Sequence, residues 1–231
     1  MEMPEFCRLD DVLPLQFGKA RTERERKMEK TLLYIHGRGG NAAEAAQFAP
    51  FCPGYTLSGV DYEEAMPWDV VPKLEAAYDA QLQKGCPVGI IANSIGAYFV
   101  MLALQDRPVN KALFISPVLD MEALIMRMMG WAAVQEEELR TKKEIETDFG
   151  QPLSWEYLQF ARNNPLHWTA PTEILYAQND TLVAWETVDR FVRNHDARLT
   201  VMEGGEHWFH TGEQMDFLGR WMRGVLEKNG K

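Results

Sequence analysis

The sequence has few cysteines, no excess of basic residues and no long apolar run. Its 231 residues include only Cys7, Cys52 and Cys86, which lack metal-type spacing and would leave one thiol over from any disulfide. No apolar run reaches the roughly 18–20 residues that a membrane-spanning helix needs. The first residues also lack the basic and apolar regions of a signal peptide. We therefore expect free thiols in a cytoplasmic protein, with no metal, no cofactor and no membrane span.

Acidic side chains outnumber basic ones. The chain has 34 Asp and Glu against 24 Lys and Arg, a formal net charge of −10. Nucleic-acid binding and docking on anionic lipid both depend on a basic surface, so we expect neither partner. Apolar residues make up 46% of the chain, which is enough for a buried core. The length suits a single domain that covers residues 1–231.

Strand-like and helix-like patterns alternate along most of the chain. Strands are expected at residues 31–35, 55–60, 88–91, 111–116, 173–177 and 198–202. Helices are expected at residues 42–51, 71–84, directly after 94, 185–195 and 215–228. This alternation predicts an α/β fold with a mostly parallel central sheet flanked by helices. The highly charged residues 21–30 are interpreted as a solvated segment before the first strand.

Residues 119–168 interrupt the alternation. They contain three helical patterns, at 121–129, 135–149 and 154–162, which is more helix than one crossover needs. We predict a small helical cap inserted into the sheet domain. The alternative interpretation is an elongated crossover that packs on the sheet away from any site.

The most informative segment is Ala92-Asn93-Ser94-Ile95-Gly96, where an apolar run stops and a helical pattern begins. A serine at a strand-to-helix junction, with small residues two positions away on both sides, is typical of a nucleophile elbow. That sharp turn would expose the Ser94 hydroxyl and place the Ile95 N–H in the first turn of a helix, where an anion is stabilised. The alternative is a small-residue turn that only lets the helix pack closely on the strand.

A glycine-rich loop follows the first clear strand, with the sequence HGRGGN at residues 36–41. Its glycines allow backbone N–H groups to point into a cavity, as an oxyanion hole requires. We predict that the backbone N–H groups of Arg38 and Ile95 form this hole. A phosphate cradle is the alternative, but the loop lacks the Lys-Ser/Thr ending of a P-loop.

A serine nucleophile needs a base, and the base needs an acid that fixes its tautomer. His207 follows a glycine pair after the last strand, and Asp180 lies just past the strand before it. We predict His207 as the base and Asp180 as the acid, with His210 and Asp120 as the alternatives. Asp180 precedes a threonine, so a plain turn or helix cap is also open.

Together, Ser94, Asp180, His207 and the HGRGG loop resemble the α/β-hydrolase superfamily, in particular compact serine esterases and acyl hydrolases with a helical cap. The resemblance runs from about residue 31 to the C-terminus. It implies nucleophile Ser94, acid Asp180, base His207, oxyanion donors at Arg38 and Ile95, and a cap over the acyl pocket. The elbow departs from the family pattern at Ala92, and the polar first thirty residues leave the early antiparallel strands of the family in doubt.

The expected substrate is a small carboxylic ester or thioester. Met121, Leu124, Met128 and Trp208 are candidates for contacting it, because methionine adapts to varied shapes. The alternative, without a role in binding, is that most apolar side chains of the cap pack against the sheet. An amidase, a lysophospholipase and a ligand-binding protein without turnover are the alternatives on the same fold. A homodimer is left open.

Overall fold

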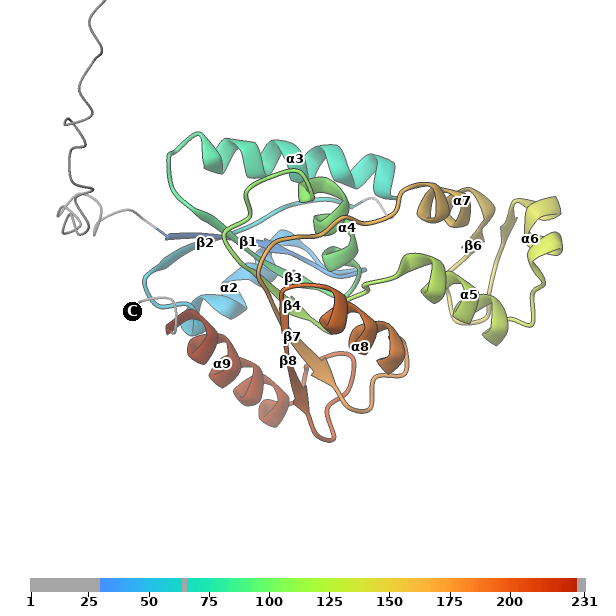
Figure 1. The fold of residues 1–231 in the computed structure, drawn as a ribbon. Helices are drawn as coiled ribbons and strands as arrows, with labels where there is room; N and C mark the ends of the chain where they lie inside the picture. Colours follow the sequence, from blue (N-terminus) through green and yellow to red (C-terminus); the bar gives the residue numbers. More distant parts are fainter. Residues whose placement is uncertain (1–29, 64–65, 228–231) are drawn as a thin grey trace, which may run out of the picture.

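The computed structural model describes residues 30–63 and 66–227, and its core is one parallel sheet covered on both faces (Figure 1). The six strands lie in the order β2-β1-β3-β4-β7-β8, and each neighbouring pair is parallel. Their bounds are Lys30–Ile35 (β1), Tyr55–Gly59 (β2), Val88–Asn93 (β3), Ala112–Ile115 (β4), Thr172–Ala177 (β7) and Ala197–Met202 (β8). The predicted fold class is confirmed.

Two apolar cores fill the space between the sheet and its helices. Alternate strand residues face opposite sides, so Leu33 and Ile35 belong to one core while Leu32 and Tyr34 belong to the other. One face is covered by α3 (Pro67–Leu82), α4 (Ile95–Leu104) and α8 (Trp185–Asn194), and the other by α2 (Ala45–Phe48) and α9 (Gly212–Glu227). This double cover explains why the four inner strands, β1, β3, β4 and β7, are buried along nearly their whole length.

The strand order reverses between β1 and β3. The connection from β1 to β2 runs over the α2 face, whereas the connection from β3 to β4 runs over the α4 face. The two connections therefore leave the sheet on opposite sides and open a crevice at the carboxyl ends of these strands. Open parallel sheets bind their ligands at such a switch point.

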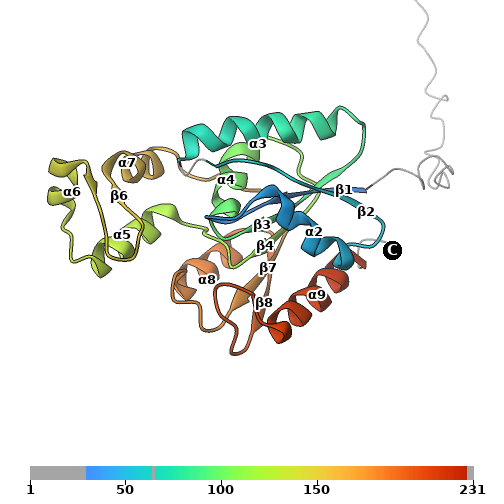
Figure 2. The same ribbon diagram turned by 180° about the vertical axis from the view of Figure 1, so that it is seen from behind.

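The segment between β4 and β7 lies at the carboxyl ends of the strands, to one side of the sheet (Figures 1 and 2). We call it the insertion, residues 121–163. It consists of α5 (Met121–Trp131), α6 (Glu136–Lys142), the short strands β5 (Glu144–Ile145) and β6 (Leu153–Ser154), and α7 (Trp155–Asn163). The strands β5 and β6 pair antiparallel to each other.

Two expected helices are wrong in extent. The helix expected at 135–149 ends at Lys142, because Lys143 has a φ of +69° and the chain then forms the β5–β6 hairpin. The helix expected at 42–51 is instead a 3₁₀ turn (Ala42–Glu44), the single turn α2 and a second 3₁₀ turn (Ala49–Phe51). Asn41 caps the first of these turns by accepting a hydrogen bond from the Ala43 N–H.

Several expectations concern residues outside the described part of the chain. These are the charged segment 21–30 except Lys30, the thiol of Cys7 and the early antiparallel strands of the N-terminal thirty residues. Among described residues, Cys52 and Cys86 are free thiols, and burial raises the pKa of Cys52 to about 12. No helix in the described ranges is long and apolar enough to cross a membrane.

Candidate active site

Ser94 lies in a strained turn between β3 and α4. Its φ of 51° and ψ of −120° belong to a region that residues with a side chain rarely adopt. The surrounding backbone holds it there: the Ser94 N–H donates to the Ile115 carbonyl at 2.9 Å, and the Ser94 carbonyl accepts from the Val118 N–H at 3.0 Å. The turn has the form of the elbow that the sequence predicts.

Small residues around Ser94 are required by close backbone contacts. A Cβ atom at Gly96 would lie 2.6 Å from the carbonyl oxygen of His36, and one at Gly37 would lie 3.3 Å from the Ser94 Cβ. Ala92, the departure from the family pattern, is fully buried in the sheet. The loop after β1 and the turn after β3 therefore pack directly on each other, with no room for larger side chains.

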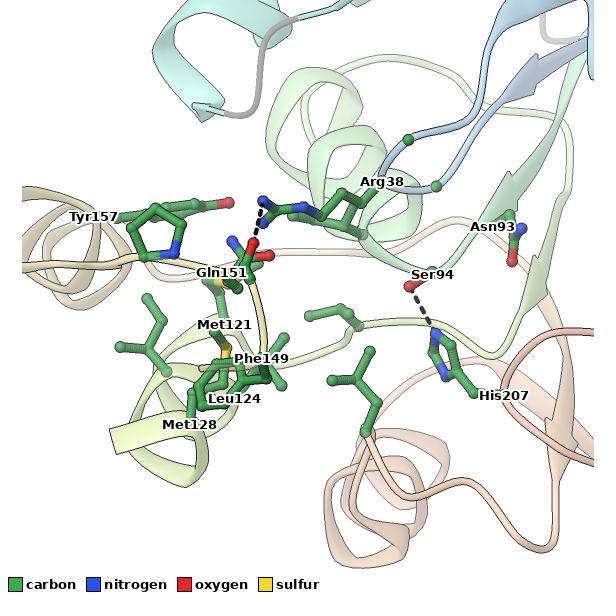
Figure 3. Close-up of a pocket in the computed structure, with 18 of the residues that line it drawn as sticks. Arg38, Asn93, Ser94, Met121, Leu124, Met128, Phe149, Gln151, Tyr157 and His207 are labelled. Atoms are coloured by element: carbon green, nitrogen blue, oxygen red, sulfur yellow. Dashed lines mark hydrogen bonds between the residues drawn. The ribbon is translucent and has the colours of Figure 1, made fainter. Parts of the chain in front are cut away.

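Ser94, His207 and Asp180 form one hydrogen-bonded line. The Ser94 Oγ lies 2.9 Å from the His207 Nε2, and the His207 Nδ1 lies 2.7 Å from the Asp180 Oδ2 (Figure 3 shows the first of these bonds). The three side chains come from the ends of β3, β8 and β7, and the structure brings them together across 113 residues of sequence separation. In this arrangement the imidazole can accept the serine proton while the carboxylate fixes its tautomer.

Asp180 also organises its own loop. Its Oδ1 accepts hydrogen bonds from the N–H groups of Leu182 and Val183, at 2.9 and 2.8 Å. The Asp180 side chain is 0% exposed and that of His207 is 3% exposed. Both carboxylate oxygens are therefore satisfied, and the same side chain both caps its turn and contacts His207.

The two alternative residues have other partners. Asp120 caps α5 by accepting from the Ala123 N–H at 2.9 Å, and its second oxygen pairs with Arg190 at 2.6 Å. His210 is exposed, with its Nδ1 2.6 Å from the Trp208 carbonyl oxygen. Neither one contacts Ser94 or His207 through a hydrogen bond among the residues that the structure describes.

The glycine-rich loop lies beside the elbow at the switch point of the sheet. Arg38 and Ile95 both line the cavity that contains Ser94, and the first N–H of a helix such as α4 has no acceptor within its own helix. His36, which opens the loop, is buried and stacks on Tyr62 with the ring centres 3.9 Å apart. The Tyr62 hydroxyl donates to the His36 carbonyl, which holds the loop in place.

A cavity of about 560 Å³ opens beside Ser94 and His207. The insertion supplies much of its wall (Figure 3). All four predicted contact residues line the cavity: Met121, Leu124, Met128 and Trp208.

The sequence does not predict several other residues that line the cavity. Phe149 and Tyr157 line the cavity, as do residues 150–154 and Leu182. Phe149 lies between β5 and β6, at the end of the stretch that the sequence predicts as helix, and the pair Gly150 and Pro152 was the available signal for a break there. Among residues 30–63 and 66–227, no three His, Cys, Asp or Glu side chains gather as a metal site would require.

Comparisons with known proteins identify the fold. No protein-family model and no curated protein sequence match the chain. Solved structures do match: Est1E from Butyrivibrio proteoclasticus has a TM-score of 0.68 at 16% identity, covering 90% of this chain and 92% of that one. Alpha/beta hydrolase domain-containing protein 10 from mouse has a TM-score of 0.67 at 17% identity, covering 86% and 90%.

A monoglyceride lipase from Saccharomyces cerevisiae has a TM-score of 0.61 at 14% identity, covering 87% of both chains. At identities this low, the structural similarity shows a shared architecture, and the chemistry has to be argued from the site itself. With its parallel sheet, its strand order and these structural neighbours, the chain has the α/β-hydrolase fold.

Proposed function

We propose that this protein is a serine hydrolase that cleaves a small carboxylic ester or thioester through an acyl-enzyme on Ser94. The observation that carries the proposal is the line from Ser94 through His207 to Asp180, with bonds of 2.9 and 2.7 Å, at the edge of a cavity. The strained backbone of Ser94 adds support, because such strain concentrates at functional sites.

In the first step, His207 Nε2 takes the proton from the Ser94 hydroxyl as its oxygen attacks the ester carbonyl carbon. The tetrahedral intermediate then collapses, the bond to the alcohol or thiol breaks, and His207 gives that leaving group its proton. In the second step, His207 takes a proton from water as the water oxygen attacks the acyl-enzyme. Ser94 leaves with that proton, and the carboxylic acid is released.

The negative charge on the carbonyl oxygen needs donors in both steps. We assign this role to the backbone N–H groups of Arg38 and Ile95, which border the cavity on either side of the switch point. Donors in fixed positions stabilise a developing charge without reorganising, and one such donor is worth about 10²–10³ in turnover. Asp180, fully buried, would stabilise the imidazolium that forms on His207.

The cavity favours a compact substrate with an apolar part. The insertion acts in this proposal as a cap, because α5 and the segment at 149–154 form the wall that faces Ser94. The names of structural neighbours are consistent with ester chemistry: one is a monoglyceride lipase and another, Est1E, is described with bound ferulic acid.

The test is hydrolysis of a chain-length series of p-nitrophenyl esters from acetate to octanoate by the full chain. Wild-type protein should turn over at least the short members, and Ser94→Ala should lower kcat by about 10³–10⁶. Ser116→Ala is the matched control: Ser116 also follows a strand and has a positive φ, and its buried hydroxyl has no hydrogen-bond partner among the described residues. The proposal is wrong if no ester is hydrolysed, or if Ser94→Ala retains the wild-type rate.

A further inference from the structure

Two of the polar side chains that line the cavity without a part in the proposed acyl transfer lie on its side toward the insertion. They are the guanidinium of Arg38 and the hydroxyl of Tyr157, and both residues line the cavity. Figure 3 shows the side chain of Arg38 extended away from Ser94 toward the insertion, and the hydroxyl end of Tyr157 directed toward the guanidinium. The two groups thus come from the loop after β1 and from α7, on either side of the same space.

The Arg38 guanidinium has donors to spare. Its one hydrogen bond is to the Gly150 carbonyl oxygen, at 3.4 Å, and it forms no ion pair with any carboxylate of residues 30–63 or 66–227. Arg107, by contrast, pairs with two carboxylates, at 3.0 and 3.1 Å. A guanidinium has five N–H donors arranged in a fork, so most of those on Arg38 remain open.

The Tyr157 hydroxyl is buried and without a hydrogen-bond partner. Tyr157 is 7% exposed, and its oxygen forms no hydrogen bond within the described residues. Burial raises the pKa of Tyr157 well above its ordinary value, so the group stays neutral and can donate its proton in a hydrogen bond. A buried polar group without a partner is unfavourable and calls for an explanation, such as a ligand that supplies the partner.

The one carboxylate that lines the cavity is already engaged. Glu44 accepts from the Tyr34 hydroxyl at 2.7 Å and from the Asn41 N–H at 3.3 Å, and it forms no ion pair with Arg38. It therefore leaves the guanidinium unneutralised. Apolar side chains line the cavity below Arg38, among them Met121, Leu124, Met128 and Phe149 (Figure 3).

We propose that Arg38 and Tyr157 bind a carboxylate of the substrate, joined by an apolar spacer to the ester that Ser94 attacks. A carboxylate accepts two parallel bonds from a guanidinium and one more from a hydroxyl, which matches the open donors. The spacer would lie on the apolar wall of the cavity, between the carboxylate and the ester. This inference rests on the proposed hydrolase function and narrows its substrate class to esters that also bear a carboxylate.

The first experiment compares charged and neutral esters of the same shape. For a carboxylate on the acyl part of the substrate, the 4-nitrophenyl half-esters of adipic and suberic acid are compared with their methyl esters. For a carboxylate on the leaving alcohol, 4-acetoxybenzoate is compared with its methyl ester. Hydrogen bonds from a charged group predict a kcat/KM about 10–100 times higher for the carboxylate in one of these pairs. Equal rates in every pair would overturn the inference while leaving the hydrolase proposal intact.

Variants then test whether these two residues cause the preference. Arg38→Met keeps the backbone N–H and the apolar stem, and should reduce the carboxylate preference to near one, whereas Tyr157→Phe should reduce it severalfold. Arg127→Gln is the matched control, because Arg127 lies on α5 outside the cavity lining and bonds to the Thr181 carbonyl. If Arg38→Met slows both members of a pair equally, Arg38 only tethers the insertion and the inference fails.

A binding measurement separates this inference from the chemistry. Calorimetry with the Ser94→Ala protein should detect tighter binding of monoethyl adipate than of diethyl adipate, by about 10–100-fold, and Arg38→Met on that background should abolish the difference. Equal binding of the two esters would overturn the anion site. A clear preference together with no hydrolysis by the wild-type protein would instead contradict the proposed function and leave the site standing.

Discussion

The two ends of the cavity differ in how their polar groups are bonded. At the Ser94 end, the hydroxyl, both nitrogens of His207 and both oxygens of Asp180 all have partners at 2.7 to 2.9 Å. At the Arg38 end, the guanidinium has one long bond, and the Tyr157 hydroxyl has none in the described part of the chain. One set of groups is complete without a ligand, and the other is not.

This difference separates two tasks. Groups that do chemistry gain from being held in place before the substrate arrives, because they then need not reorganise in the transition state. Groups that select a substrate gain from having no competing partner, because the right ligand is then the only source of the missing bonds. The first set comes from strand ends of the rigid sheet, whereas Tyr157 comes from the insertion.

After the loss of Ser94 itself, the largest effect expected at the Ser94 end comes from Asp180→Asn. The amide oxygen can still accept from the Leu182 and Val183 N–H groups, so the loop should hold, but an amide N–H facing His207 Nδ1 forces the wrong tautomer. We expect kcat for p-nitrophenyl acetate to fall about 10⁴-fold with little change in unfolding temperature. Asp120→Asn, which alters only the α5 cap and the Arg190 pair, should stay within a few-fold of wild type. Similar losses in both variants would remove Asp180 from its proposed role.

A second change disturbs the elbow by one methyl group. In Gly96→Ala the new Cβ would lie 2.6 Å from the His36 carbonyl oxygen and 2.8 Å from that of Ile35, and backbone cannot move aside cheaply. We expect a loss of about 1–3 kcal/mol in the free energy of unfolding by urea denaturation. A shift of the Ser94 turn should also lower kcat by about 10²-fold.

Gly130→Ala serves as the control for that substitution. Gly130 lies in α5 with no atom within 4 Å of its added Cβ, so alanine should leave stability unchanged or raise it by up to about 1 kcal/mol. If Gly96→Ala proves as stable and active as Gly130→Ala, the close contact between the elbow and the loop after β1 is not what holds Ser94 in place.

The smallest expected effect concerns the Tyr157 hydroxyl, at the Arg38 end of the cavity. Tyr157→Phe removes a hydroxyl that has no hydrogen-bond partner in residues 30–63 and 66–227, so the free energy of unfolding without ligand should change by less than about 0.5 kcal/mol, or rise. Tyr176→Phe removes a hydroxyl that donates to the Val183 carbonyl at 2.9 Å, and should cost about 1–2 kcal/mol. Equal losses in thermal or urea unfolding would mean that the Tyr157 hydroxyl already has a partner in the free protein.

The residues at the Ser94 end could be predicted from sequence because each follows a strand of the parallel sheet. Parallel strands end at one edge, so Ser94, Asp180 and His207 had to lie near one another once the strands were recognised. Asp180 and Asp120 both follow strands, so strand ends alone do not separate them, and the structure shows Asp120 bonded to Arg190.

The arrangement at the Arg38 end could not be predicted in the same way. Phe149 lies in the turn between β5 and β6, and Tyr157 lies in α7, directly after this hairpin. The chain has helical composition up to Lys142 and is then turned by the positive φ of Lys143. Local composition does not show how such an insertion folds back on a sheet. Arg38 was chosen for its backbone N–H, and nothing in the sequence indicates that its side chain crosses to Gly150.

The most direct test of the central claim is covalent labelling of the full chain with a fluorophosphonate, read by intact mass and peptide mapping. Attack by Ser94 Oγ on phosphorus with loss of fluoride should yield one adduct, on Ser94, that is absent from Ser94→Ala and retained in Ser116→Ala. No adduct on the wild-type protein, or an adduct of equal yield on Ser94→Ala, would contradict Ser94 as the nucleophile.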